Sequence, residues 1–132
     1  MRVLIVDDDP DVRSSLYDGI KTVGAEVIHT AESGEEALAK AIQMRYDLVT
    51  LDIKMSGASG IDILSVIRWM MPCSVIAIVS GYTEEVSEMA LDHTDLVLAK
   101  PGRVDILQKL VTLTGELVEK REALRGLDDT QN

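Results

Sequence analysis

Polar side chains directly follow several short apolar runs of this sequence. They are Asp7 and Asp8, Asp52, Ser80 and Lys100. The run Leu48-Val49-Thr50-Leu51 ends at Asp52, and because a carboxylate is costly in an apolar core, we expect Asp52 where the run leaves the interior. A carboxylate held beside a cation and hydrogen-bond donors can attack phosphorus. We therefore predict that Asp52 accepts a phosphoryl group, with Lys100 and Ser80 contacting the transferred oxygens.

The acids of this set also predict a metal site. Carboxylates from Asp7, Asp8 and Asp52 in one cleft would repel one another, and such a cluster favours a raised carboxyl pKa or a bound cation. Oxygen ligands point to Mg²⁺ or Mn²⁺ rather than to zinc, and such an ion often completes its shell with phosphate oxygens. The alternative for the Asp7-Asp8-Asp9 cluster alone is a helix cap without a metal.

Apolar runs alternate with helical patterns along the chain. The predicted strands are 2–6, 25–29, 46–51, 74–79 and 96–99. The predicted helices are 10–23, a segment after Ser33, 61–70, 83–90 and a segment from about residue 103 onward. This alternation predicts an α/β, flavodoxin-like (βα)5 three-layer sandwich, with a five-stranded parallel sheet in the order 2-1-3-4-5. The polar side chains above then share the sheet edge at which ligands bind in such folds.

Residues suited to capping precede three of these helices. Asp9 is a good N-cap, and Pro10 suits the first helical position. Ser33 and Glu36 form a predicted capping box, with Ser33 as the cap and Glu36 reaching back. Thr83 is the expected cap of the short fourth helix.

The single tryptophan and the two histidines carry no predicted chemistry. The single tryptophan, Trp69, ends the helix 61–70 together with Met70 and Met71, and we expect these three residues to pack rather than to line a ligand site. His29 and His93 have no metal-binding partner in the sequence, so we expect them to be structural or exposed.

The last predicted helix continues beyond the residues that a small domain needs. Leu110, Leu117 and Leu124 repeat every seven residues, which is typical of a helix-pairing seam. The alternative is a long surface helix whose first half packs on the sheet. We expect a domain over residues 1–118 and a C-terminal extension with a polar tail over residues 119–132.

Composition excludes several classes of function. With 132 residues the chain suits one domain, and its net charge of −10 makes direct nucleic-acid binding unfavourable. The single cysteine excludes an internal disulfide, and no apolar stretch reaches the roughly 20 residues that cross a bilayer. We expect a cytoplasmic protein that contacts neither nucleic acid nor membrane.

Taken together, these motifs resemble the receiver domain of a two-component response regulator. The matching pieces are Val3-Leu4-Ile5-Val6-Asp7-Asp8-Asp9-Pro10, Asp52 with Met55 and Gly60, Ser80-Gly81, and Lys100-Pro101. They occur in order over residues 1 to about 118, at the spacing expected of that family.

The resemblance implies a specific function. Asp52 would take a phosphoryl group from the phosphohistidine of a sensor histidine kinase or a phosphotransfer protein. Asp7, Asp8, Asp52 and the backbone carbonyl of Lys54 would hold Mg²⁺ (or Mn²⁺), while Ser80 moves to the phosphoryl group. The change would switch a protein-interaction surface toward a downstream effector or a fused output domain. Two oligomeric states stay open: a single chain, or a homodimer through the face of the fourth helix, fifth strand and fifth helix or through the extended fifth helix.

Several positions depart from the family pattern. Val97 stands where the family has an aromatic switch residue, Ser56 where proline is usual and Gly102 where an aromatic is usual. The side chain of Lys54 is a candidate modulator of the phosphoryl group, its alternative being a solvent-facing lysine. Tyr82 is a further candidate, because it could slow attacking water.

Three other classes of function fit the sequence less well than a phosphoacceptor domain does. An aspartate-nucleophile phosphatase needs a second acid two residues after the nucleophile, where this chain has Lys54. A flavin- or nucleotide-binding module needs a Gly-rich loop after the first strand, where this chain has acids. A receiver-like scaffold that binds partner proteins without phosphorylation remains the alternative. We expect no enzyme activity beyond weak autophosphorylation and autodephosphorylation.

Overall fold

The computed structural model describes residues 1–55, 60–81, 86–100 and 104–131. Five parallel strands form one sheet in the order β2-β1-β3-β4-β5, which confirms the predicted flavodoxin-like fold. The strands are β1 (Arg2–Val6), β2 (Val27–Ala31), β3 (Leu48–Leu51), β4 (Val75–Ser80) and β5 (Leu96–Ala99). The helices are α1 (Pro10–Lys21), α2 (Gly34–Gln43), α3 (Gly60–Met70), α4 (Glu88–His93) and α5 (Val104–Arg125), followed by the 3₁₀ turn η2 (Asp129–Gln131).

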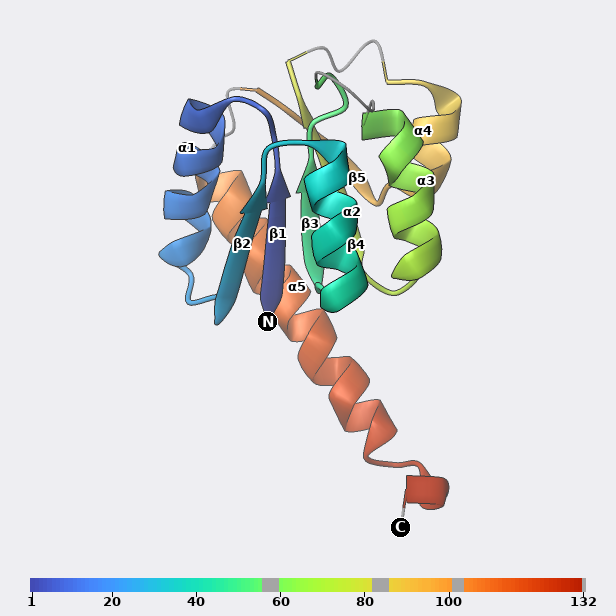
Figure 1. Cartoon of the computed structure of the whole chain (residues 1–132). Coiled ribbons are helices and arrows are strands. Elements are labelled where there is room, and N and C mark those ends of the chain that lie inside the picture. Colours follow the sequence, from blue (N-terminus) through green and yellow to red (C-terminus); the bar gives the residue numbers. More distant parts are fainter. Residues whose placement is uncertain (56–59, 82–85, 101–103, 132) are drawn as a thin grey trace.

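The helices form two layers, one on each face of the sheet (Figure 1). Successive residues of a strand point to opposite faces. Leu4 and Val6 of β1 therefore pack toward α2, α3 and α4, while Val3 and Ile5 pack toward α1 and α5. Both faces of the central strands are thereby buried, as expected for parallel strands with continuous apolar runs.

Three strands, β2, β3 and β4, begin later than the sequence predicts. β1 and β5 have the predicted bounds, whereas β2 begins two residues later than expected, at Val27. The reason is the chain reversal before it: Gly24 has a positive φ of 85°, and the amides of Glu26 and Val27 both donate to the Met1 carbonyl. The ladder with β1 therefore starts with Arg2 opposite Val27.

Helix caps were predicted well for the first helices and wrongly for α4. The Asp9 carboxylate accepts from the Asp11 amide at 2.9 Å, and Ser33 Oγ accepts from the Glu36 amide at 3.1 Å. The Glu36 carboxylate reaches back one residue further than a standard capping box and accepts from the amide of Glu32. α4 begins at Glu88, not after Thr83, which lies outside the described residues.

The N-cap of α4 is Ser87, whose hydroxyl accepts from the Ala90 amide at 3.2 Å. Ser and Thr are similar caps, so the sequence alone did not distinguish the two positions. Ala90 is fully buried against the α2–α3 side of the core, and this contact fixes the position of the short helix.

The long fifth helix is confirmed. Its first half buries Leu107, Leu110, Val111 and Thr114. Its second half continues past the sheet (Figure 1), and there Leu117 and Leu124 are exposed. No helix of the described residues combines the length and the apolar composition needed to span a membrane.

The expectation that Trp69 packs in the core was wrong. Trp69 is 83% exposed, whereas Met71 is buried and Met70 is partly buried. The buried face of α3 carries Leu64 and Ile67, and a residue two positions after Ile67 points to the opposite side of a helix.

Candidate phosphoryl-acceptor and metal site

The structure brings the three predicted acids together at the carboxyl edge of the sheet. The Asp52 amide donates to the Val6 carbonyl at 3.0 Å, so Asp52 extends the pairing of β3 with β1. On the other side of β1, the Asp7 amide donates to the Ala31 carbonyl at 3.0 Å. One carboxylate oxygen from each of Asp7, Asp8 and Asp52 lies within 4.8 Å of the other two.

These acids differ in their exposure to solvent. Asp7 and Asp52 are buried, and Asp8 is exposed at the mouth of the site. The Asp9 amide donates to Asp7 Oδ1 at 2.9 Å, and the Arg13 guanidinium donates to the Asp7 backbone carbonyl at 2.8 Å. Arg13 was not predicted, because a contact across the turn into α1 has no sequence signature.

Lys100 follows β5 and turns its ammonium into the acid cluster. Its Nζ lies 2.7 Å from Asp7 Oδ2 and 3.2 Å from Asp52 Oδ2. Its amide donates to the Ser80 carbonyl at 2.9 Å, which continues the pairing of β4 with β5. Burial lowers the pKa of Lys100, but hydrogen bonds and charge attraction from Asp7 and Asp52 outweigh it, so the net pKa is raised. Lys100 is therefore a permanent cation at neutral pH.

The environment of Asp52 makes its carboxyl group more basic than an ordinary aspartate. Burial is the main cause of the raised pKa of Asp52, and the nearby charge of Asp7 adds to it. The Lys54 amide, 3.0 Å from Asp52 Oδ1, and the Lys100 ammonium act in the opposite direction and only partly compensate. An ionised Asp52 is thus a good nucleophile whose charge needs a further counter-ion.

The residues fit a hard divalent cation. The cluster offers only carboxylate oxygens, which suit Mg²⁺ or Mn²⁺. Three carboxylates against the single ammonium of Lys100 leave two formal negative charges among these groups, the amount that one divalent ion neutralises.

The remaining predicted site residues differ in their burial, and some of them lie outside the described residues. Ser80 ends β4 and is fully buried, and the Lys54 side chain is exposed. Val97 in β5 is half-buried and packs against the α2–α4 side of the core. Tyr82, Ser56, Gly102 and the Pro101 end of the Lys100-Pro101 bond lie outside the described residues.

Gly60 has a structural role at the site that the sequence did not reveal. Its amide donates to the Ile53 carbonyl at 3.2 Å as α3 begins. A Cβ on residue 60 would lie 2.5 Å from Ile53 Cα and closer still to the Asp52 carbonyl oxygen. The backbone that carries Asp52 can therefore approach α3 only because residue 60 has no side chain.

The chain is similar to known proteins over most of its length. A family model described as the response regulator receiver domain matches residues 3–112. The transcriptional regulatory protein PrrA of Mycobacterium tuberculosis is 36% identical over 123 residues, which cover 91% of this chain and 51% of PrrA. A protein-glutamate methylesterase/protein-glutamine glutaminase of Archaeoglobus fulgidus is 35% identical over 124 residues, covering 91% of this chain and 35% of that enzyme.

A solved structure shows the same fold with ligands. The response regulator TrrA of Thermotoga maritima, in complex with Mg²⁺-BeF, is 36% identical with a TM-score of 0.78, over 86% of this chain and 97% of that chain. This chain belongs to the response regulator receiver domain family. It spans about a third to a half of the length of the curated relatives that it matches.

Proposed function

We propose that Asp52 accepts a phosphoryl group from the phosphohistidine of a sensor histidine kinase or a phosphotransfer protein. The observation that carries this proposal is the position of Asp52: a buried carboxylate whose pKa is raised, grouped with Asp7 and Asp8 and contacted by Lys100. An aspartate that served only as a turn residue would not require two further acids and a shared ammonium.

The transfer makes one bond and breaks one. An oxygen of ionised Asp52 attacks phosphorus, and the P–N bond to the donor imidazole breaks. The electron pair of that bond returns to the imidazole nitrogen, which takes up a proton from solvent. Lys100 and the hydroxyl of Ser80 then face the phosphoryl oxygens, and Lys100 changes partner from the Asp52 carboxylate to these oxygens.

Asp7, Asp8, Asp52 and the backbone carbonyl of Lys54 are the residues that would hold Mg²⁺ (or Mn²⁺). When bound, the ion neutralises charge on the acids and on the phosphoryl oxygens. The Mg²⁺-BeF complex of TrrA supports this assignment, because BeF occupies that relative together with the metal.

We assign the phosphoacceptor domain to residues 1–118 and the extension of α5 with its polar tail to residues 119–132. The curated relatives include a transcriptional regulator and a methylesterase that are longer than this chain, which supports an effector or output domain as the downstream partner. Pairing of two chains, through α4, β5 and α5 or through the extended α5, is part of this proposal, as is a cytoplasmic location. The domain itself would have no activity beyond slow autophosphorylation and autodephosphorylation.

A second candidate function is a scaffold that binds partners without phosphorylation. The observation that favours it is Val97, because a β-branched aliphatic side chain packed on the core lacks the two alternative orientations of an aromatic switch. The two functions differ in one consequence. A phosphorylated switch changes its partner affinity when Asp52 is modified, and a scaffold does not.

Beryllofluoride tests the primary proposal without a kinase. Beryllofluoride and Mg²⁺ together should raise the Tm of the chain, because a ligand of the folded state alone stabilises it. Neither compound alone should have the full effect. The variant Asp52→Asn should lose the response, and Asp18→Asn, an exposed change on α1, should retain it. A response retained in Asp52→Asn would refute the proposal.

A further inference from the structure

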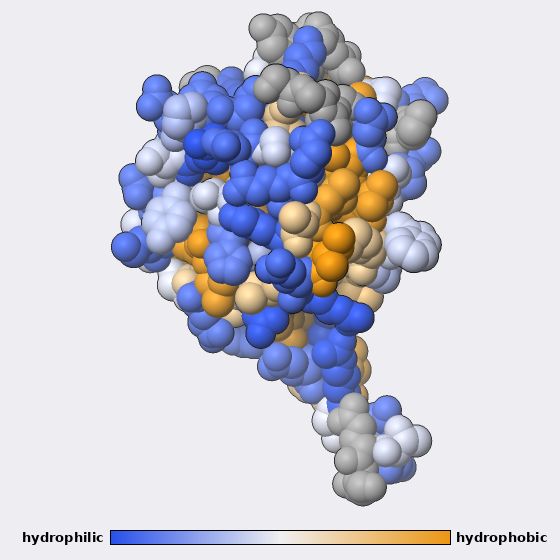
Figure 2. Space-filling model, viewed as in Figure 1, coloured by the Kyte–Doolittle hydropathy of each residue, from blue (hydrophilic) through white to orange (hydrophobic). Residues whose placement is uncertain are grey.

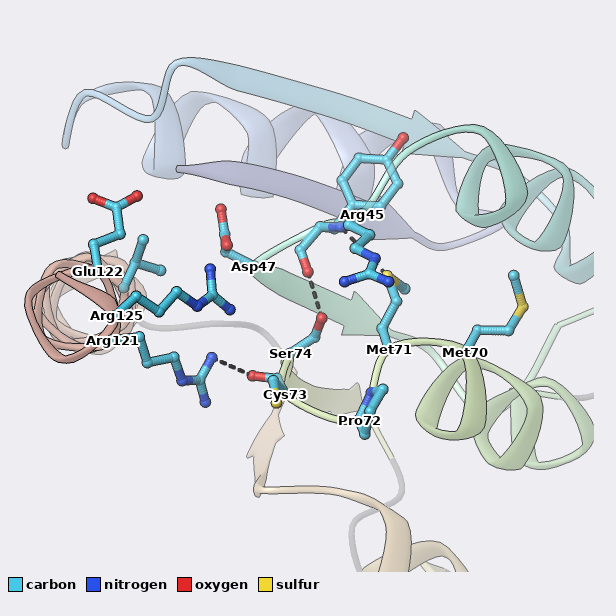
Figure 3. Close-up of a pocket in the computed structure, with 12 residues that line it drawn as sticks. Arg45, Asp47, Met70, Met71, Pro72, Cys73, Ser74, Arg121, Glu122 and Arg125 are labelled. Carbon is cyan, nitrogen blue, oxygen red and sulfur yellow. Dashed lines mark hydrogen bonds between the residues drawn. The ribbon is translucent and has the colours of Figure 1, made fainter. Parts of the chain in front are cut away.

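A hollow lies at the edge of the sheet opposite to the one that carries Asp52. It is about 280 Å³ in volume and is bounded by the loop before β3, the loop from α3 to β4, and the second half of α5 (Figure 3). Arg45, Arg121 and Arg125 line it from two of these elements. Nothing in the phosphoryl-acceptor chemistry uses these residues.

The three arginines turn their guanidinium groups toward this hollow (Figure 3). Arg121 donates a hydrogen bond to the Cys73 carbonyl and so attaches α5 to the α3–β4 loop. Among the described residues, no ion pair within 4.0 Å joins any of the three arginines to a carboxylate. Two acids, Asp47 and Glu122, also line the hollow, and the Asp47 carboxylate accepts the backbone amide of Arg2 at 2.8 Å. The three guanidinium groups exceed the two carboxylates of the lining by one formal charge, and in a chain of net charge −10 this local excess of positive charge favours an anionic ligand.

An apolar surface adjoins the arginines. A neighbouring hollow shares Arg45, Met70 and Met71 with the arginine-lined hollow and extends to Ile42 and Trp69. Ile42 is 75% exposed and Trp69 is 83% exposed, and Figure 2 shows apolar residues gathered over α2 and α3. Tryptophan and arginine are the residues most enriched at the energetic centres of protein interfaces, and methionine is also enriched at interfaces.

We propose that these two adjoining hollows form a docking site for an acidic segment of a partner protein that carries an apolar anchor residue. The anchor would contact Trp69 and Ile42, and carboxylates beside it would pair with Arg45, Arg121 and Arg125. A small anion would be satisfied by the arginines alone and would leave the apolar half of the surface unused. A second copy of this chain is an outcome of the test, because the pairing surfaces named above lie on α4, β5 and α5 and do not include Trp69 or Ile42.

The proposal is tested on the full chain with a random-peptide display library. Selected peptides should carry Asp or Glu beside an aliphatic or aromatic residue. Trp69 is the only tryptophan, so its emission reports on this face, and it should shift to shorter wavelength as a synthetic selected peptide binds. Binding should weaken with added salt, because the ion pairs are near the surface.

Matched variants decide where the peptide binds. Arg125→Glu should weaken binding about tenfold or more, since it replaces an attraction by a repulsion. The Arg125 side chain makes no hydrogen bond or ion pair among the described residues, and only the backbone carbonyl of Arg125 accepts a hydrogen bond, from the Asp128 amide. The variant should therefore fold normally, which circular dichroism checks. Arg121→Glu is the second variant. Lys120→Glu is the control, because Lys120 is exposed on the same helix and does not line the hollow.

Four outcomes would overturn the proposal. The first is a selection that yields no acidic peptides, and the second is equal loss of binding in Arg125→Glu and Lys120→Glu. The third is a shift of Trp69 emission with chain concentration alone, which would indicate a second copy. The fourth is full displacement of the peptide by millimolar citrate or inorganic phosphate, which would indicate a small-anion site. None of these outcomes depends on phosphorylation of Asp52.

Discussion

The ammonium of Lys100 lies 2.7 Å from the carboxylate of Asp7, although most of the chain separates the two residues. The same ammonium lies 3.2 Å from Asp52. One cation is thus shared by two buried acids on adjacent strands, and it is held there by β5, the edge strand farthest from β2. This arrangement keeps the phosphoryl-acceptor edge folded while leaving two formal negative charges for a divalent ion.

Removal of that shared cation should destabilise the chain. Lys100→Met leaves Asp7 and Asp52 buried without their ammonium. Loss of one partner from a fully buried ion pair costs about 3–5 kcal/mol, and we expect the lower end of this range because the Lys100 side chain is 20% exposed. Thermal melts in metal-free buffer at pH 7 should show a lower Tm. Lys109→Met, an exposed change on α5, is the control. Equal melting temperatures for the two variants would show that Lys100 does not neutralise the cluster.

Removal of the negative charge of Asp52 should stabilise the chain in the absence of metal. Burial chiefly, and Asp7 in addition, raise the pKa of Asp52, so the folded chain holds this proton more tightly than the unfolded chain. Between the ordinary carboxyl pKa and the raised folded pKa, unfolding releases a proton, and stability therefore falls as pH rises. Asp52→Asn should remove this contribution and raise the Tm at pH 7 without metal by about 3 °C.

The pH dependence supplies the control for this prediction. Urea unfolding at a series of pH values gives the free energy of unfolding of the wild type and of Asp52→Asn. The two free energies should differ least below the ordinary carboxyl pKa and most above the raised pKa of Asp52. Asp18→Asn should follow the wild type throughout. A wild type that is more stable than Asp52→Asn at pH 7 in metal-free buffer would contradict the electrostatic account of the site.

Substitutions of the adjacent residues Asp8 and Asp9, in the turn after β1, should have different effects on metal binding and on helix capping. Asp8 belongs to the carboxylate cluster, and Asp9 caps α1. Asp8→Asn should strongly reduce the stabilisation by Mg²⁺, which for a single site reaches about 2.7 kcal/mol at 100 times the Kd. Asp9→Ala should cost about 1 kcal/mol in stability and retain the response to Mg²⁺. If both variants respond to Mg²⁺ like the wild type, the cluster is a cap and not a metal site.

Gly60 should tolerate no side chain. Gly60→Ala forces a methyl group against the backbone of Asp52 and Ile53, and we expect a loss of about 3 kcal/mol together with a weaker response to beryllofluoride. Gly115→Ala is the matched control, because a Cβ there meets nothing within 4 Å. In the middle of α5 that change should stabilise the chain by about 0.5–1 kcal/mol. Denaturant unfolding measures the free energy of unfolding of both variants. Equal effects would contradict the close approach of residue 60 to the backbone of Asp52 and Ile53.

Much of the site was predictable because it depends on periodicity and on one topological rule. Apolar runs define the strands, and parallel strands put the residues after Val6, Leu51 and Ala99 on one edge. Asp7, Asp52 and Lys100 then meet without any knowledge of side-chain contacts.

What could not be predicted depends on contacts between distant segments. The start of β2 is set by two amides that share the Met1 carbonyl, and the start of α4 by Ser87 together with the burial of Ala90. The exposure of Trp69, by contrast, follows from the helical spacing of Leu64 and Ile67 and was predictable from the sequence.

The central claim is that Asp52 accepts a phosphoryl group and becomes an acyl phosphate, and intact mass spectrometry tests it most directly. Incubated with Mg²⁺ and a small phosphodonor such as acetyl phosphate, the wild type should gain the mass of one phosphoryl group. Removal of Mg²⁺ by EDTA should abolish the gain, as should Asp52→Asn. An unchanged mass in the wild type, or the same gain in Asp52→Asn, would contradict the account.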